Sequence, residues 1–172
     1  MELSGNTVLI TGGASGIGFA FAERFIKAGN TVIVCGRRES KLKEAKEKHP
    51  ELITCVCDVA VETERLALFE WIKEHHPGVN VLVNNAGIQQ RYHILKADVI
   101  DNWADYNKEI TVNMEAPIHL AMLFSRYFAE KAGKTAIINV SSGLAFTPMA
   151  VAPIYSSTKA ALHSFTMSLR HQ

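Results

Sequence analysis

Residues 7–18 read TVLITGGASGIG, and no other part of the chain constrains the architecture as tightly. The first five residues are β-branched or apolar, which is typical of a strand buried on both faces of a sheet. Gly12 permits a tight turn, Gly16 leaves room for backbone to approach a pyrophosphate, and Gly18 lets the following helix pack closely on the strand. The N-terminus of that helix offers unpaired N–H groups and the positive end of a dipole. The stretch therefore predicts a phosphate-binding turn between a buried strand and a helix.

Outward from this stretch, short apolar runs alternate with amphipathic segments. Strands are predicted at residues 7–11, 31–35, 52–57, 79–83 and 134–140. Helices are predicted at residues 17–28, 40–49, 62–75 and 98–132, and a last helix begins near residue 155 and is still helical at residue 172. Ser40 is the expected N-cap of the second helix. The alternation predicts an α/β fold: a three-layer, doubly wound parallel sheet in a single domain spanning residues 1–172.

The composition is that of a globular protein and argues against several function classes. Of the 172 residues, 48% are hydrophobic, which is enough for one core. The formal net charge of +1 gives no basic surface for nucleic acid or an acidic membrane. Cys35, Cys55 and Cys57 are too few for a disulfide framework, so a reducing, cytoplasmic location is predicted. We expect no targeting segment, no membrane span and no metal site.

The residues after the second predicted strand bear on the choice of cofactor. An NAD site usually places an acidic residue there, roughly twenty residues beyond the glycine turn. This chain has Gly36, Arg37 and Arg38 instead. Two guanidinium groups can hold a 2′-phosphate by forked hydrogen bonds, so NADP(H) is predicted, with Arg37 contributing more than Arg38. The alternative is that both arginines belong to the solvated helix beyond, in which case the chain would use NAD.

A second group of residues points to proton transfer. Tyr155 and Lys159 are four residues apart, which places them on one face of the last predicted helix. A free tyrosine is a poor base at neutral pH, but an ammonium about 4 Å away would stabilise the phenolate by roughly 4 kcal/mol at an effective dielectric constant near 20. The pair is therefore a candidate general acid/base. Ser142, at the end of the fifth predicted strand, would hold a substrate oxygen next to the phenol.

With these residues in place, the chain resembles the short-chain dehydrogenase/reductase family. Its glycine turn matches the family's TGxxxGxG motif, and residues 84–87 match the NNAG segment that lies along the cofactor. The resemblance implies that Asp58 holds the adenine amino group and that Asn113 supports a proton-relay water. The cofactor contacts expected from the motifs and the resemblance are Gly12, Ser15, Gly16, Ile17, Gly18, Arg37, Arg38, Asp58, Val59, Asn85, Ala86, Gly87, Tyr155 and Lys159.

The resemblance also implies the reaction. Tyr155 would exchange the substrate proton, Lys159 would bind the nicotinamide ribose, and Ser142 would orient the carbonyl while hydride passes between nicotinamide and carbon. The substrate would be a small alcohol or carbonyl compound. A homodimer or homotetramer is expected, with Trp103 as an interface candidate. Residues 139–168 are also similar to short-chain oxidoreductases encoded in cell-wall D-alanylation operons, which does not reveal a substrate.

The chain departs from the family pattern at its end. Family members are usually longer, and the part absent here normally supplies two strands and the substrate lobe. We therefore expect a C-terminally truncated domain that retains the tetrad of Asn113, Ser142, Tyr155 and Lys159. Two alternatives follow: a non-catalytic nucleotide-binding or dimerising protein derived from such an enzyme, and an NAD-preferring dehydrogenase.

Overall fold

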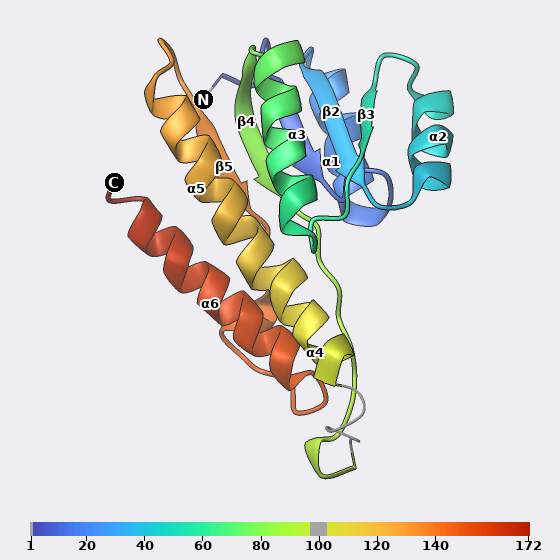
Figure 1. The fold of residues 1–172 in the computed structure, drawn as a ribbon, viewed down its shortest axis with the longest axis vertical. Helices are drawn as coiled ribbons and strands as arrows, with labels where there is room; N and C mark the ends of the chain where they lie inside the picture. Colours follow the sequence, from blue (N-terminus) through green and yellow to red (C-terminus); the bar gives the residue numbers. More distant parts are fainter. Residues whose placement is uncertain (1, 97–102) are drawn as a thin grey trace. The chain divides into compact units, whose positions relative to one another are not determined.

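The computed structural model describes residues 2–96 and 103–172. It contains a five-stranded sheet with the strand order β3-β2-β1-β4-β5 (Figure 1). The strands are β1 (Thr7–Thr11), β2 (Thr31–Gly36), β3 (Ile53–Val56), β4 (Val79–Asn84) and β5 (Ala136–Asn139). β1 pairs in parallel with β2 and β4, and β2 pairs in parallel with β3. The predicted doubly wound parallel sheet is confirmed.

The helices fall close to the predicted positions. They are α1 (Gly16–Lys27), α2 (Glu39–Lys48), α3 (Glu62–His75), α4 (Trp103–Ile110), the π-helix η2 (Thr111–Glu115), α5 (Ala116–Ala129) and α6 (Pro153–Leu169). Two short 3₁₀ helices are η1 (Ile94–Lys96) and η3 (Gly143–Ala145).

The helices differ from the predicted ones at some of their ends. The N-cap of α2 is Arg38, so the prediction of Ser40 in that role is wrong. A serine two residues downstream lies inside the first turn, where its hydroxyl cannot cap that turn's N–H groups. The last helix ends at Leu169 and is not continuous to residue 172. Residues 98–102 of the long predicted helix lie outside the described residues.

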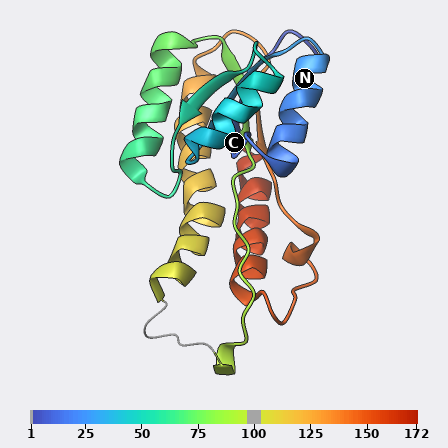
Figure 2. The same cartoon turned by 90° about the vertical axis from the view of Figure 1, so that its right-hand side faces the viewer.

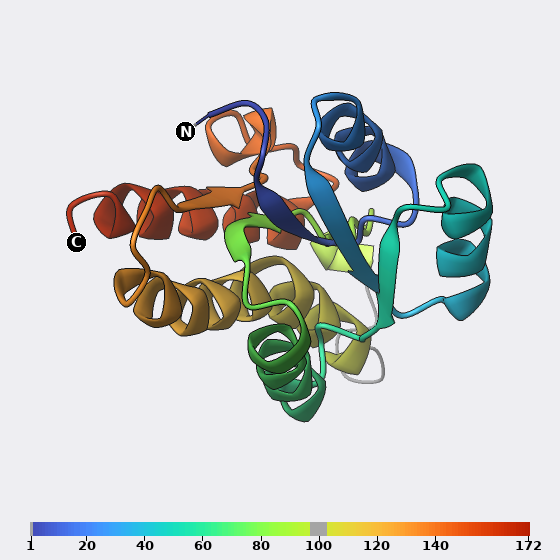
Figure 3. The same ribbon diagram turned by 90° about the horizontal axis from the view of Figure 1, so that it is seen from above.

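The chain divides into two compact units. The first comprises Met1–Ala86 and Leu120–Ile138, and the second comprises Gly87–His119 and Asn139–Gln172. In the first unit, β1, β2 and β4 are buried throughout their centres, and Leu9, Ile33 and Leu82 are 0% exposed. Figure 3 shows α1 on one face of these strands and α3 on the other. Because both faces are covered, the centres of the strands are apolar.

The second unit is built around α6. This helix packs along α4 and η2, and Figure 2 shows the two helical segments side by side. At its C-terminal half, Thr166 Oγ1 accepts a hydrogen bond of 2.9 Å from Asn139 Nδ2. In the described part of the chain, no helix is both long and apolar enough to cross a membrane.

Candidate active site

The glycine turn between β1 and α1 is shaped as the sequence predicts. Gly12 has φ +64°, and a Cβ there would lie 3.0 Å from the backbone of Ala86. Gly16 also has a positive φ, +56°, with open space around its Cα. A Cβ on Gly18 would collide with the carbonyl of Gly12 and the side-chain amide of Asn85. Each of the three positions therefore requires glycine, for conformation or for space.

The start of α1 keeps its backbone donors free. Its N-cap residue, Ser15, makes no side-chain capping hydrogen bond. Its hydroxyl instead accepts a 3.2 Å hydrogen bond from Arg38 Nη2. The first N–H groups of a helix have no partner within the helix, so an uncapped turn can receive an anion. Ile17 is 67% exposed, an apolar side chain uncovered directly beside these donors. These features fit the pyrophosphate of a dinucleotide.

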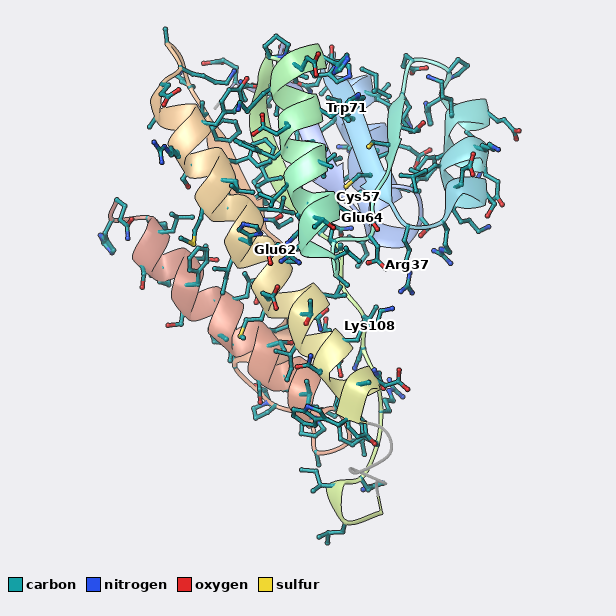
Figure 4. All side chains as sticks on the ribbon, in the orientation of Figure 1. Arg37, Cys57, Glu62, Glu64, Trp71 and Lys108 are labelled. Carbon is teal, nitrogen blue, oxygen red and sulfur yellow. The ribbon has the colours of Figure 1, made fainter. Side chains whose placement is uncertain are left out.

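The two predicted arginines differ in their surroundings. Arg38 reaches back to the glycine turn through Ser15, whereas Arg37 projects from the end of β2 (Figure 4). Both are exposed. The structure thus gives Arg38 a direct link to the turn that the sequence did not indicate.

Asn85 acts on the turn itself. Its Nδ2 donates to the carbonyl oxygens of Thr11 at 3.0 Å and Gly12 at 3.3 Å. The hydroxyl of Thr11 accepts from the N–H groups of Asn85 at 3.1 Å and Ala86 at 3.0 Å. The end of β1 and the end of β4 are therefore locked together, and the Asn85 side chain is a support for the glycine turn.

Asp58 lies just beyond β3, in a turn that is tightly held. One carboxylate oxygen, Oδ1, accepts from Ala60 N at 3.0 Å, and the Asp58 N–H donates to Glu64 Oε2 at 2.7 Å. The carbonyl of Val59 accepts from Arg65 Nη1 at 2.7 Å. In Figure 4, Glu64 lies at the start of α3, beside Cys57.

Sequence reasoning missed Glu64 and Arg65. Arg65 is 1% exposed and shares the buried face of α3 with Leu68 and Ile72. The sequence does contain a signal for the burial of Arg65. Arg65 lies three residues before Leu68 and seven residues before Ile72, which places all three on one face of the helix. To use this signal, one would have had to predict that the helical face with Leu68 is buried and that Leu66 is not. Leu66 is 39% exposed.

In the second unit, Tyr155 and Lys159 stand one turn apart at the start of α6. Lys159 is 4% exposed, and its Nζ lies 5.7 Å from the centre of the Tyr155 ring. Nζ also donates a 2.8 Å hydrogen bond to the carbonyl of Val140, just after β5. Burial lowers the pKa of Lys159. The ammonium is thus held by one backbone acceptor and lies alongside the phenol ring.

Ser142 ends the segment after β5 and caps η3. Its Oγ accepts from Leu144 N at 3.2 Å. A hydroxyl has one donor and two acceptor sites, so this bond leaves the O–H available to a substrate oxygen.

The Asn113 side chain is fully engaged within the protein. It lies in the π-helix η2 and is 0% exposed. Its Oδ1 accepts from Ile88 N at 2.9 Å, and its Nδ2 donates to Ile88 O at 2.8 Å and Thr158 Oγ1 at 3.3 Å. Thr158 in turn donates to the carbonyl of Tyr155 at 2.8 Å. The carboxamide therefore links residue 88 to the start of α6, and both hydrogens of its amide are used within the protein. The predicted support of a relay water by Asn113 stays a prediction.

In the second unit, Asn113 is linked to Tyr155 through Thr158, and Lys159 lies beside the Tyr155 ring; Ser142 belongs to the same unit. In the first unit, hydrogen bonds join Arg38 and Asn85 to the glycine turn. Thr158 is a supporting residue that the sequence analysis did not single out. Among the described residues, no three His, Cys, Asp or Glu side chains are placed to hold a metal ion.

Comparisons with known proteins decide the family. The short chain dehydrogenase model matches residues 6–172. The chain belongs to the short-chain dehydrogenase family. The resemblance seen in the sequence motifs is therefore confirmed.

Two curated relatives illustrate the match. The uncharacterized oxidoreductase DltE of Bacillus subtilis (strain 168) is 49% identical over 172 residues, covering 100% of this chain and 67% of that protein. The L-xylulose reductase of Caenorhabditis elegans is 33% identical over 175 residues, covering 99% of this chain and 67% of that protein. This short-chain dehydrogenase sequence therefore spans about two thirds of the length of these relatives.

Solved structures of the family agree in fold. L-sorbose reductase from Gluconobacter frateurii, complexed with NADPH and L-sorbose, has a TM-score of 0.86 and 34% identity, covering 99% of this chain and 65% of its own. A short-chain dehydrogenase/reductase from Burkholderia phymatum in complex with NAD has a TM-score of 0.91 and 25% identity, covering 99% and 61%. The family fold is common to proteins that bind either nicotinamide cofactor.

Proposed function

We propose that this protein is an NADP(H)-dependent oxidoreductase that interconverts an alcohol and a carbonyl compound. The observation that supports it best is the arrangement in the second unit, where Lys159 lies beside the Tyr155 ring and Asn113 holds the same helix through Thr158. A buried cation next to a phenol stabilises the phenolate, which is what a tyrosine needs to exchange a proton near neutral pH.

The cofactor site is assigned to the first unit. The free N–H groups at the start of α1 would hold the pyrophosphate, and the exposed Ile17 would lie against the cofactor. Asp58 would accept from the adenine amino group with its remaining acceptor capacity, next to Val59. Ala86 and Gly87, which follow β4 in the sequence, would lie along the cofactor. Bound nicotinamide would supply or accept the hydride.

The chain's own groups carry the proton. In the direction of reduction, the Tyr155 hydroxyl donates a hydrogen bond to the carbonyl oxygen and transfers its proton as negative charge develops there. The Ser142 O–H donates to the same oxygen and orients it. Lys159 stabilises the phenolate that remains. In oxidation the same groups act in reverse.

The names of two relatives indicate which carbonyl compounds to test first. Among the relatives, L-xylulose reductase and L-sorbose reductase are named for ketoses. We therefore place ketoses in the first panel of carbonyl compounds. A homodimer or homotetramer and a cytoplasmic location remain predictions, and Trp103, 53% exposed, is the residue to examine at an interface.

The first experiment is a calorimetric titration of the chain with NADPH and NADH at one fixed salt concentration, followed by turnover assays with the carbonyl panel. Tighter binding of NADPH with turnover of a panel member supports the proposal. Binding without turnover on a broad panel favours a nucleotide-binding protein that has kept the family site. Binding of neither cofactor contradicts the proposal for this chain.

We predict that Arg37→Ala reduces the preference for NADPH over NADH by about ten- to a hundredfold. A hydrogen bond to a charged group contributes roughly 1.5–3 kcal/mol, and about 1.4 kcal/mol corresponds to a factor of ten. Because Arg37 is exposed, the melting temperature should stay unchanged. The two dissociation constants, measured by calorimetry for the variant and the wild type, check this.

Arg38→Ala is the matched comparison, because Arg38 is bound to Ser15. Its loss should weaken binding of both cofactors as the turn loosens, with a smaller change in preference. An unchanged preference in Arg37→Ala would show that the arginine faces solvent and would leave an NAD-using enzyme as the better assignment.

A further inference from the structure

Residues 88–92, which follow the NNAG segment, are held in place at alternate positions. Both polar backbone groups of Ile88 are bound by the Asn113 side chain. The N–H of Gln90 donates to Glu109 Oε1 at 3.1 Å, and the N–H of Tyr92 donates to Val151 O at 2.9 Å. Spacing by two is the pattern of an extended chain, so alternate N–H groups point the same way. We call residues 88–92 the crossing segment.

Residues on one face of α4 and η2 form hydrogen bonds to the crossing segment, as a neighbouring strand would in a sheet. Asn113 and Glu109 are four residues apart, and Asp105, four residues earlier, accepts from Gln90 Nε2 at its carbonyl at 2.9 Å. Positions four apart lie on one face of a helix. The crossing segment therefore lies along the side of α4 and η2, and Glu109 is the middle of the three residues of this helical face that bind it.

Glu109 is an unusual residue for this position. It is 0% exposed, and its second oxygen, Oε2, is buried with no hydrogen-bond partner among the described residues. Burial raises the pKa of Glu109, and the N–H of Gln90 opposes that effect. In the described part of the chain, the Tyr92 phenol interacts with Glu109, and the centre of the Tyr92 ring lies 4.7 Å from that of Tyr106. A buried carboxyl group is costly unless its contacts compensate.

The two ends of the crossing segment are attached, directly or through Asn113, to residues on either side of Tyr155 in the sequence. Its first residue shares Asn113 with Thr158, three residues after Tyr155. Its last residue is bound to Val151, four residues before Tyr155. Between these attachments, Gln89 and Arg91 are exposed. The course of the segment thus decides where these two side chains are presented.

We propose that Glu109 is a positioning residue of this enzyme: its carboxyl group holds Gln90, and so fixes the crossing segment that presents Gln89 and Arg91 beside the Tyr155 helix. The inference rests on the proposed function for its effect on substrate, but not for the attachment itself. Loss of Glu109 would release the N–H of Gln90 and loosen the middle of the segment, without removing any group that exchanges protons. Substrate binding should therefore suffer more than the chemical step.

The attachment is tested by amide hydrogen exchange followed by NMR on the ¹⁵N-labelled chain. In Glu109→Leu, the Gln90 amide should exchange at least tenfold faster, while the Leu9 amide in β1 keeps its protection. Glu109→Gln retains an acceptor oxygen and should restore most of the protection of Gln90. Lys108→Leu, at the exposed neighbouring position, is the matched control and should change neither amide (Figure 4 labels Lys108 on α4).

A second measurement serves if Glu109→Leu does not fold. In the wild type, the Gln90 amide shift should titrate with a midpoint above the ordinary range of glutamate, and in Glu109→Gln this titration should vanish. Unchanged exchange of Gln90 in Glu109→Leu, or the same titration in Glu109→Gln, would overturn the proposal.

The kinetic arm uses a ketose or other carbonyl compound that the wild type turns over. Glu109→Leu should raise KM at least fivefold and keep kcat within twofold, with Glu109→Gln close to wild type. A loss confined to kcat would contradict the positioning role. If the wild type turns over nothing in the panel, the proposed function fails while the exchange data still decide whether Glu109 holds the segment.

Discussion

Tyr155→Phe is expected to reduce kcat by about 10²–10⁴-fold, which is the range for a positioned acid or base. The phenylalanine ring can keep the packing of the phenol against Lys159 but has no proton to exchange. KM and the dissociation constant of the cofactor should change little, because the lost group acts at the substrate oxygen. Steady-state kinetics with a turned-over carbonyl substrate, alongside calorimetry with NADPH, measure both effects.

The control for Tyr155→Phe is Ser157→Ala. Ser157 is exposed on the same helix, and its hydroxyl donates to the carbonyl of Pro153 at 2.9 Å. The activity of the Ser157→Ala variant should equal that of the wild type. Activity of Tyr155→Phe within threefold of the wild type would mean that another group supplies the proton, and the assignment of this tyrosine would be withdrawn.

Gly18→Ala is expected to lower both stability and cofactor affinity. The new methyl group would meet the carbonyl of Gly12 and the amide of Asn85, and neither can retreat because Asn85 is bonded to the same turn. Overpacking of this kind costs about 1–3 kcal/mol. For a chain of this size, that corresponds to a fall in melting temperature of roughly 2–12 °C. Thermal unfolding and a calorimetric titration with NADPH give the two values.

Gly78→Ala is the matched control for Gly18→Ala. A Cβ at Gly78 would lie 3.4 Å from Thr7 Oγ1, an ordinary contact, and the backbone there does not need a positive φ. Its stability and cofactor affinity should match the wild type. Equal stability of Gly18→Ala and the wild type would show that the helix can shift away from the strand, and that close packing is not what the glycine provides.

The sheet and the helices around it could be predicted because their patterns are local. A strand covered on both faces is apolar at its centre, and residues 8–10 and 81–83 show this directly. Tyr155 and Lys159 were singled out by their spacing of four residues, whereas Asn113 came only from the family resemblance, and the roles of all four tetrad residues stay predictions. The strands and most of the helix bounds depend on residues close in sequence, and they lie near their predicted positions.

The supporting hydrogen bonds could not be predicted in the same way. Asn85 was expected beside the cofactor, but its amide is bonded to Thr11 and Gly12, more than 70 residues away in sequence. Glu109 reads as a solvated charge on a helix, and only the burial of α4 beside the crossing segment shows that it is enclosed. Contacts across such distances depend on packing, which a sequence pattern does not encode.

The π-helix η2 has a consequence for how this chain tolerates change. A π turn contains one residue more than an α turn, so η2 is equivalent to an α-helix that carries a one-residue insertion. The wide turn takes up the rotation of that extra residue, so the residues before and after η2 keep their faces, and Glu109 and Asn113 both reach the crossing segment. An extra residue between Glu109 and Asn113 that no wide turn absorbed would instead rotate one of them by about 100° around the helix axis relative to the other, and the two side chains would no longer share a face. Changes of length in this part of the helix are therefore restricted to those that a wide turn can take up.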